Sequence, residues 1–588
     1  MIYFFSILAY LLLLGCIGAW KSRQVKTEED FAVAGRTLSP WIMVCTMLAV
    51  WIGTGSIVGN AERTYKDGMA ALILPAGTFI GMILLSMIAA KARRIEASSV
   101  PEIIGGRFGQ TARALSVVSL IVAYMVIVSY QFNAGGAVLE VITGKKPSVN
   151  LAVGDTVTAR QLVRGWVIYT PPADWTGEAV IAMQGDDDGE AVYRVEVVAS
   201  EEIGKAKERL EDKTRTVAIR RDNYKRVLYD DAGLSEGHYR IASFAGEGTL
   251  VLEEPRLTKE IATVIAAVFI ILFTMLAGLM SLAYADIVTG IVITTAMLIT
   301  LPVYWVMAGG IAGMTEAFSA MGDRPQHMQF WGVYSPVTII NFCLPVFLLV
   351  LGDANQYQRI FASRSAKGAK AAVTTMIFLA LAIELLIIAS AWTAGSMTPD
   401  PENGKYILIY AARHYLPLPL GCLFMVTVVG IIVSTANSFL LVPATTFIKD
   451  VYLNHINPKA NAKRTIFISR FMVVVFGVVA YIVSRAFAES TGFFEKALYA
   501  FTIYGASITP SLVAAIVWPR ATKAGAISSI LSGTVIALVW SEADFIHARL
   551  PEAVSGLDAV LPAITVSVIC LVVVSLLTKN PQQNKVID

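Results

Sequence analysis

Residues 418–446 read LPLGCLFMVTVVGIIVSTANSFLLVPATT, an apolar stretch without a charged side chain. This length and composition predict a helix that crosses a membrane, because about 20 apolar residues span a bilayer core of about 30 Å. Inside the stretch lies the pentad Ile431-Ile-Val-Ser434-Thr435. In a helix the Ile431 carbonyl and the Ser434 and Thr435 hydroxyls share one face, and three such hard oxygens suit a small alkali cation.

The composition of the whole chain indicates the same class. Hydrophobic residues make up 56% and charged residues 15%, against about 25% charged in soluble proteins. Residues 145–260 hold 38 of the 91 charged side chains, so one polar segment interrupts an apolar protein. We therefore predict an all-α polytopic membrane protein with a polar insert. A net charge of +3, with basic residues in short loops, gives no support for nucleic-acid binding.

Hydropathy predicts about thirteen membrane-spanning helices. Their orientation follows from the loops, because cytoplasmic loops carry an excess of Lys and Arg. With the N-terminus outside, 21 of these residues fall in the inner loops and tail and eight at the outer side, which places the C-terminus in the cytoplasm. The predicted spans are 2–20, 41–60, 69–90, 113–140, 260–279, 282–308, 335–352, 370–394, 418–446, 465–484, 495–518, 524–541 and 557–577.

This topology divides the chain into three parts. Residues 1–144 hold the first four helices and residues 259–588 hold the other nine, and together they form one membrane domain. Residues 145–258 form an extracytoplasmic insert, in which β-type runs such as 191–198 alternate with turn signals such as Pro171-Pro172. We expect a small β-rich domain, whose simplest role is that of a passive spacer.

Six short motifs occur in order along the apolar part of the chain, in register with the predicted helices. Together they resemble the sodium/solute symporter family, over the whole chain except the insert. The motifs are Phe31-Ala-Val-Ala-Gly-Arg-Thr-Leu38, Trp51-Ile-Gly-Thr-Gly-Ser56, Val100-Pro-Glu-Ile-Ile-Gly-Gly-Arg-Phe-Gly109, Tyr357-Gln-Arg359 with Ala362-Ser-Arg-Ser365, Ser434-Thr435, and Lys449-Asp-Val-Tyr452.

The resemblance implies a LeuT-type fold, in which two five-helix repeats of inverted topology surround a site at the membrane midplane. The repeats would be predicted helices 2 to 6 and 7 to 11. Gly53 and Gly55 in helix 2, and Pro345 and Gly352 in helix 7, make the first helix of each repeat easy to interrupt. Interrupted helices are tolerated in a membrane where their freed carbonyls line a cavity or bind an ion.

The same resemblance implies a sodium site between helices 2 and 9. Its ligands would be the main-chain carbonyls of Ala49, Ile52 and Ile431 and the hydroxyls of Ser434 and Thr435. All of these ligands are neutral, so the site would hold a monovalent cation weakly enough to release it. The alternative is that both hydroxyls bond back to carbonyls one turn earlier in their own helix.

The sequence defines the solute only as a small organic molecule. Trp51 and Ser56 lie at the predicted break of helix 2, where the family binds substrate, and an indole face can hold a quaternary ammonium. A quaternary amine, an amino acid and an organic acid therefore all stay open. A sugar is disfavoured, because the sugar branch of the family has Asn and Tyr where residues 346–351 are apolar here.

Two carboxylates in the apolar part are candidates for coupling or for the ion path. Glu384 lies in the middle of a span, where a charge costs at least about 2.5–3.5 kcal/mol. It could exchange protons, face a cationic solute or hold a second cation, and the alternative is a protonated Glu bonded to a neighbouring helix. Asp286, at the inner end of its helix, could attract sodium that leaves inward, and the alternative is helix capping or loop bonding.

These features predict a sodium-coupled secondary active symporter of the cell (inner) membrane that imports a small organic solute by alternating access. The implied partners are the solute, sodium as coupling ion and the lipid bilayer. We expect no other cofactor and no enzymatic activity, because the sequence lacks a nucleotide loop and a metal-spaced His cluster. Two alternatives remain open: a proton-coupled transporter that uses Glu384, and a transporter-derived sensor whose insert binds a ligand.

Overall fold

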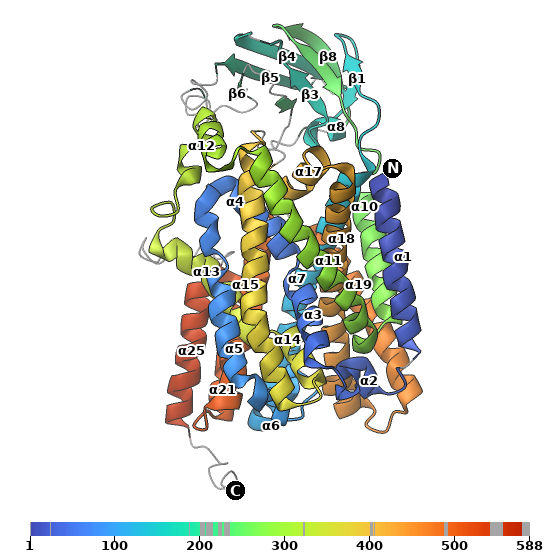
Figure 1. Ribbon diagram of the computed structural model, residues 1–588, viewed down its shortest axis with the longest axis vertical. Coiled ribbons are helices and arrows are strands. Elements are labelled where there is room, and N and C mark those ends of the chain that lie inside the picture. The colour runs from blue at the N-terminus through green and yellow to red at the C-terminus, as the bar shows by residue number, and fades with distance from the viewer. Residues whose placement is uncertain are drawn as a thin grey trace.

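The protein is a bundle of long helices with two small sheets at one end (Figure 1). α1 begins at the end that carries the sheets, and α25 ends at the opposite end. The computed structural model describes residues 2–578 apart from 24, 174, 187–188, 200–205, 207–215, 221–225, 229–233, 235, 322–323, 400–403, 405, 487–491 and 541–556.

The long helices follow the predicted spans closely. Within the described residues, eleven helices, or twelve if one bent pair counts as a single span, are long and apolar enough to cross a membrane. Each of the thirteen predicted spans contains a helix, but the span predicted at 524–541 is the shorter α22 and falls outside this count. The long helices are α1 Ile2–Ser22, α3 Pro40–Trp51, α5 Ala76–Arg94, α7 Gln110–Thr143, α10 Lys259–Leu276, α11 Leu279–Met307, α13 Pro336–Gly352, α15 Ala366–Ser396, α18 Leu418–Thr446, α19 Ala462–Ala486, α20 Phe493–Ser507, α22 Lys523–Val539 and α25 Val560–Leu577.

Shorter helical segments connect or extend these spans. Several of them lie at the ends of long helices, so that one span is built from two pieces. They are α2 Glu28–Val33, η1 Ala34–Arg36, η2 Gly55–Asn60, α4 Ala61–Asp67, η3 Gly68–Ile73, α6 Val100–Phe108, α8 Ala159–Val163, α12 Gly310–Ala320, η5 Pro325–Met328, α14 Ala354–Ala362, α17 Ile407–His414, η6 Phe447–Ile456 and α21 Thr509–Val517.

The helix that opens the first repeat is broken in its middle, as its glycines predicted. α3 ends at Trp51, η2 begins at Gly55, and the two pieces of the span are bent by 52°. Ile52 has a ψ of 88°, which is outside the helical range. The Ser56 amide donates to the Gly53 carbonyl (3.1 Å), although the Ile52 carbonyl would be its partner in a regular α-helix. The break therefore frees the Ile52 carbonyl from helical bonding.

The helix that opens the second repeat is broken as well. α13 ends at Gly352 and α14 begins at Ala354, and the Asp353 side chain between them accepts from the Asn355 amide (3.1 Å). The predicted span ended at 352, whereas the structure continues through α14. The polar residues of α14 thus follow the apolar run 346–351, which is the part of this helix that disfavours a sugar.

α18 lies inside the bundle, where it packs against α3, α7, α11 and α19. All of its residues from Thr427 to Thr446 are buried. A helix enclosed on all sides needs no polar face, which explains why its sequence is apolar throughout. The hydroxyls of Ser434 and Thr435 therefore face other helices.

Strands β1–β9 form two sheets inside the predicted insert. The strand orders are β1-β9-β3-β7 and β2-β8-β4-β5-β6, with β5 and β6 paired in parallel. A hydrophobic core of its own joins the two sheets, with Val167 and Ile181 fully buried in it. The strands are β1 Val149–Leu151, β2 Thr156–Thr158, β3 Val167–Thr170, β4 Gly177–Gly185, β5 Glu190–Val198, β6 Thr216–Arg220, β7 Arg226–Leu228, β8 His238–Ala245 and β9 Thr249–Leu252.

The two ends of the insert leave the helices side by side. The Arg256 amide donates to the Gly144 carbonyl (2.9 Å), and the Lys146 amide donates to the Glu254 carbonyl (2.8 Å). The Lys146 ammonium also lies 2.6 Å from the Glu254 carboxylate, and together with the Gln161 amide it holds the pKa of Glu254 below its usual range. An insert whose ends meet adds a domain without separating the helices that flank it.

Candidate functional site

The end of α3 and the middle of α18 meet at the first break. The last helical bond of α3 runs from the Ile52 amide to the Leu48 carbonyl (2.9 Å), so the carbonyls that follow are available to other partners. The Thr435 hydroxyl lies 3.5 Å from the Ala49 carbonyl oxygen and 3.4 Å from that of Val50. The structure thus brings the predicted sodium ligands Ala49 and Thr435 together.

The hydroxyls of Ser434 and Thr435 both point away from their own helix. Ser434 donates to the carboxylate of Asp286 on α11 (2.5 Å), and Thr435 faces the end of α3. The back-bonded arrangement is therefore not the one that the structure adopts. A serine that gives its proton to a carboxylate keeps its oxygen lone pairs, so this oxygen can still face a cation.

The other two predicted ligands are main-chain carbonyls, and the role of all five ligands stays a prediction. Ile52 lies in the break, where its carbonyl is free of helical bonding. Ile431 is fully buried in α18, one helical turn before Ser434 and Thr435. Its carbonyl accepts one helical bond at most from the main chain and has a second lone pair.

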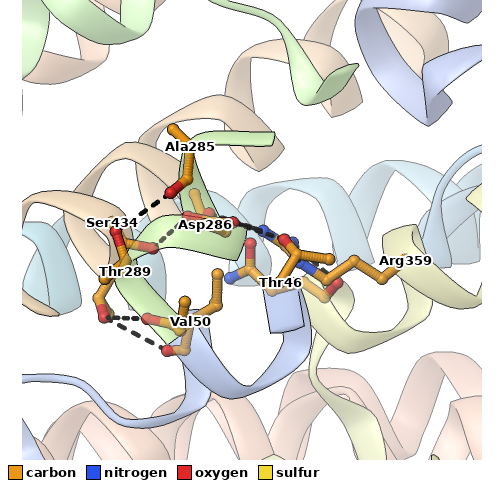
Figure 2. A network of polar contacts seen from close by, with 11 residues as sticks. Thr46, Val50, Ala285, Asp286, Thr289, Arg359 and Ser434 are labelled. Atoms are coloured by element: carbon orange, nitrogen blue, oxygen red, sulfur yellow. Dashed lines mark hydrogen bonds and ion pairs between the residues drawn. The ribbon is translucent and has the colours of Figure 1, made fainter. Parts of the chain in front are cut away.

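Asp286 is a buried acid at the centre of a polar network (Figure 2). Its carboxylate accepts from Ser434 on one side and from Thr46 Oγ1 (2.5 Å) on the other. The same carboxylate lies 3.7 Å from the Arg359 guanidinium. Gly278 is the N-cap of α11, so the capping alternative is wrong for Asp286, which instead joins α3, α11, α14 and α18.

Arg359 is a member of this network to which the sequence analysis gave no role. It is fully buried on α14 and donates to Thr46 Oγ1 (3.1 Å), Ser438 Oγ (2.8 Å) and the Asn355 carbonyl (3.2 Å). The sequence did not signal its burial, because Arg359 follows polar residues and lies next to a predicted loop. Buried acidic and basic side chains are each costly unless they meet, and the structure places this guanidinium 3.7 Å from the Asp286 carboxylate.

A small cavity of about 50 Å³ lies beside the break, with Thr435 in its wall. The predicted substrate-site residues Trp51 and Ser56 both line it, and so does Glu384. The structure therefore places the candidate substrate residues and the candidate sodium ligands next to each other.

Glu384 lies in the wall of this cavity and does not face lipid. Its Oε1 atom accepts from Trp51 Nε1 (2.9 Å) and from the Thr78 hydroxyl (3.1 Å). The side chain is 3% exposed, and Oε2 has no hydrogen-bond partner within the described residues. Glu384 is thus bonded to neighbouring helices, as one alternative expected, but through one oxygen only. Both partners donate, so neither bond requires a protonated Glu384.

Tyr130 and Gln131 of α7 also line the cavity, although their residue types did not single them out. Thr54, in the break, donates to Gln131 Oε1, which ties α7 to the broken helix. Polar residues of this kind commonly bond membrane helices to one another. Their side-chain type therefore carried no signal that separated a cavity wall from a helix contact.

Comparison with known proteins identifies the family. A model of the sodium:solute symporter family matches residues 31–166 and 238–533, which is most of the chain, and the gap between them lies in the insert. The chain belongs to the sodium:solute symporter family. Members of this family are transporters and not enzymes, and the many apolar helices of this symporter-family protein agree with a location in a membrane.

Two proline transporters are among the relatives of this symporter-family protein. The osmoregulated proline transporter OpuE of Bacillus subtilis (strain 168) is 25% identical over 319 residues, which are 53% of this chain and 62% of that protein. A sodium/proline symporter of Staphylococcus aureus (strain USA300 / TCH1516) is 26% identical over 356 residues, 58% of this chain and 67% of that protein. The alignments thus span about two thirds of these relatives.

Solved structures confirm the predicted LeuT-type fold. A Na+-coupled sialic acid symporter in a substrate-bound outward-open state matches with a TM-score of 0.66 at 13% identity, over 99% of this chain and 98% of that one. Mhp1, a nucleobase-cation-symport-1 family transporter in a closed conformation with bromovinylhydantoin bound, matches with a TM-score of 0.50 at 12% identity, over 94% and 96%. At such identities the likeness establishes the fold alone.

Proposed function

We propose that this protein is a sodium-coupled secondary active symporter that imports a small organic solute by alternating access. One observation carries the proposal. The Thr435 hydroxyl of α18 lies 3.5 Å from the Ala49 carbonyl oxygen at the end of α3, and Thr435 is also part of the cavity wall. Sodium bound at this contact would touch a residue that borders the solute, which is what coupled transport requires.

The proposed sodium ligands suit a monovalent ion. All are neutral oxygen donors, so a divalent ion would keep an uncompensated charge in a buried place. The nearby Asp286 carboxylate is neutralised by Arg359 at 3.7 Å. Sodium is the coupling ion, and no other cofactor is proposed. The ligands are the carbonyls of Ala49, Ile52 and Ile431 and the hydroxyls of Ser434 and Thr435.

The proposed solute is a quaternary amine, an amino acid or an organic acid, with a sugar disfavoured. The proline transporters among the relatives support a solute of this size. We place the protein in the cell (inner) membrane with its N-terminus and insert outside and its C-terminus in the cytoplasm. The start of α1 and the sheets lie at the same end of the bundle (Figure 1), as this orientation requires.

A proton-coupled transporter is the second candidate, and one observation favours it. Glu384 is a buried carboxylate with one unpartnered oxygen in the cavity wall. A carboxylate in this place can take up a proton from one side of the membrane and release it to the other. A solute gradient driven by pH alone, in the absence of sodium, would establish this second function.

The sodium site is tested without knowledge of the solute. The purified full-length protein, reconstituted in lipid, is titrated with sodium chloride against potassium chloride, and its unfolding temperature is followed, because an ion that binds the folded state raises this temperature. Ser434→Ala and Thr435→Ala each remove one ligand. We expect each to weaken sodium binding by about 10- to 150-fold, since a bond to a charged group contributes about 1.5–3 kcal/mol.

Thr427→Ala is the matched control for these two variants. Thr427 is also a buried threonine of α18, but its hydroxyl donates to the Leu423 carbonyl of its own helix (2.8 Å). It should keep the sodium response of the native protein. Equal stabilisation by sodium in Ser434→Ala, Thr435→Ala and Thr427→Ala would refute the proposed site. Uptake of radioactive proline at a rate that does not depend on the sodium gradient would refute sodium coupling for that solute.

A further inference from the structure

Glu384 is the charged side chain of the solute cavity. The cavity wall, as far as the described residues form it, is otherwise neutral, with aromatic rings, aliphatic side chains, small residues, hydroxyls and the amides of Asn60 and Gln131. Glu384 comes from α15, while Trp51 and Thr78, which hold it, come from α3 and α5. Three helices thus cooperate to place one carboxylate in the wall.

The two oxygens of this carboxylate have different surroundings. Oε1 is saturated, because the Trp51 indole N–H (2.9 Å) and the Thr78 hydroxyl (3.1 Å) both donate to it. Oε2 is buried and has no hydrogen-bond partner in the part of the chain that the structure describes. A buried acceptor without a partner is costly, and the arrangement therefore leaves a place for a donor on the ligand.

The charge of Glu384 also has no cationic partner among the residues that the structure describes. Its two hydrogen-bond donors are neutral side chains. Arg359, the fully buried cation of the bundle, lies 3.7 Å from Asp286 instead. A carboxylate buried in a membrane protein usually faces a cation, because an unpaired charge is expensive in such surroundings.

The rest of the wall indicates which kind of cation fits. A small hard cation needs several oxygen ligands, whereas much of this wall is aromatic. The indole of Trp51 and the rings of Phe342, Phe439, Phe494 and Phe501 line the same cavity. Aromatic faces attract organic ammonium groups, including quaternary ones.

We propose that the cavity binds its solute through an ammonium group that contacts Glu384 Oε2 and the surrounding aromatic rings. The transported solute is therefore an organic cation or a zwitterion, and a solute with a carboxylate as its sole charged group is excluded. This inference rests on the proposed symport function and specifies its substrate class. Trp51 acts as a positioning residue, because its indole N–H fixes the carboxylate while its ring lines the cavity.

The test compares ammonium compounds with carbon isosteres. Binding of choline and of its uncharged isostere dimethylbutanol, and of L-proline and cyclopentanecarboxylate, is measured by calorimetry on the reconstituted full-length protein in saturating sodium chloride. Potassium chloride replaces sodium in the blank, because organic-cation salts would compete for the site. We expect choline, proline or both to bind, and each isostere to bind at least about 30-fold more weakly than its ammonium partner.

Glu384→Gln keeps the shape of the side chain and removes its charge. We expect this variant to lose at least about 30-fold in affinity for the ammonium compound that binds the native protein, and to keep the rise in unfolding temperature with sodium. Trp51→Phe keeps an aromatic ring but removes the N–H donor, so a smaller loss is expected. Glu316→Gln, at an exposed glutamate of α12, is the matched control and should leave affinity unchanged.

Several results would overturn the proposal: no binding of either ammonium compound to the native protein, equal binding of the isosteres, or an unchanged affinity in Glu384→Gln. A Glu384→Gln variant that loses its response to sodium but still binds the solute would assign the carboxylate to an inorganic cation instead. Failure of the sodium site is seen separately, as an undiminished sodium response in Ser434→Ala and Thr435→Ala, so the two proposals fail by different measurements.

Discussion

The buried pair of Asp286 and Arg359 supports a quantitative prediction. Their charged atoms are 3.7 Å apart, with side chains 3% and 0% exposed. At an effective dielectric constant of about 20, two unit charges at this distance attract by about 4.5 kcal/mol. Removal of one partner from a buried pair typically costs about 3–5 kcal/mol, because the other charge is left uncompensated. Asp286→Asn and Arg359→Gln should each lower the free energy of unfolding by this amount.

The double variant distinguishes pairing from simple loss of packing. With both charges removed, no uncompensated charge is left in the buried site. We therefore expect the double variant to be less destabilised than the sum of the single variants by about 3–4 kcal/mol. Equilibrium unfolding in lipid bicelles, followed by tryptophan fluorescence, measures all four proteins.

An exposed pair provides the control for this cycle. Arg194 and Glu178 lie 3.2 Å apart in the insert, with side chains 57% and 54% exposed. Their coupling should be about 0–1 kcal/mol, since exposed ion pairs contribute little. Additive effects at Asp286 and Arg359, or a coupling no larger than that of the exposed pair, would show that the buried pair does not stabilise the fold in the way we infer.

The same two variants should shift sodium affinity in opposite directions. Asp286 accepts from the Ser434 hydroxyl, so Arg359→Gln leaves a negative charge beside a proposed sodium ligand and should strengthen sodium binding. Asp286→Asn leaves the positive charge of Arg359 nearby and removes the acceptor of Ser434, so it should weaken sodium binding. A merely structural role of the pair would weaken sodium binding in both variants, which the sodium-dependent unfolding temperature reveals.

Two further predictions concern the break in α3 and the insert. Gly53→Ala would place a Cβ atom 2.9 Å from Thr435 Cγ2 and 3.2 Å from its Oγ1, so we expect weaker sodium-dependent stabilisation. Gly55→Ala is the control, because its Cβ would meet its nearest atom at 3.5 Å and the sodium response should be kept. Equal responses of the two variants would contradict a sodium site at this contact. Replacement of residues 145–255 by two glycines joins ends that already meet. It should leave sodium-dependent uptake of proline or choline largely intact. Loss of solute binding in this variant would favour the sensor alternative.

The sequence predicted the helices well because their signal is local. Each apolar run predicts its own membrane span, and the glycines of the second predicted helix indicated where that helix breaks. The second break lies one residue beyond the predicted end of its span, because Asp353 and the polar residues of α14 do not look like a membrane helix by composition. They are tolerated because α14 is buried on all sides by protein, a fact that hydropathy cannot contain.

The site was only half predictable because its partners are distant in the chain. Ser434, Thr435, Asp286 and Glu384 each stood out alone as polar residues in apolar runs. What each one contacts was not visible: 148 residues separate Ser434 from Asp286, and 333 separate Trp51 from Glu384. Arg359 did not stand out in the sequence, since a charged residue near a predicted loop carries no sign of full burial.

The arrangement explains how sodium and solute could be coupled without a path across the bundle. The carbonyls of Ala49 and Ile52 are proposed sodium ligands, and Trp51, between them in the chain, holds Glu384. Sodium that fixes the end of α3 therefore also fixes the indole and, through it, the carboxylate that is to meet the ammonium. Linkage requires the converse, so the solute must strengthen sodium binding by the same factor by which sodium strengthens solute binding. The coupling between sodium and solute would therefore reside at the end of α3.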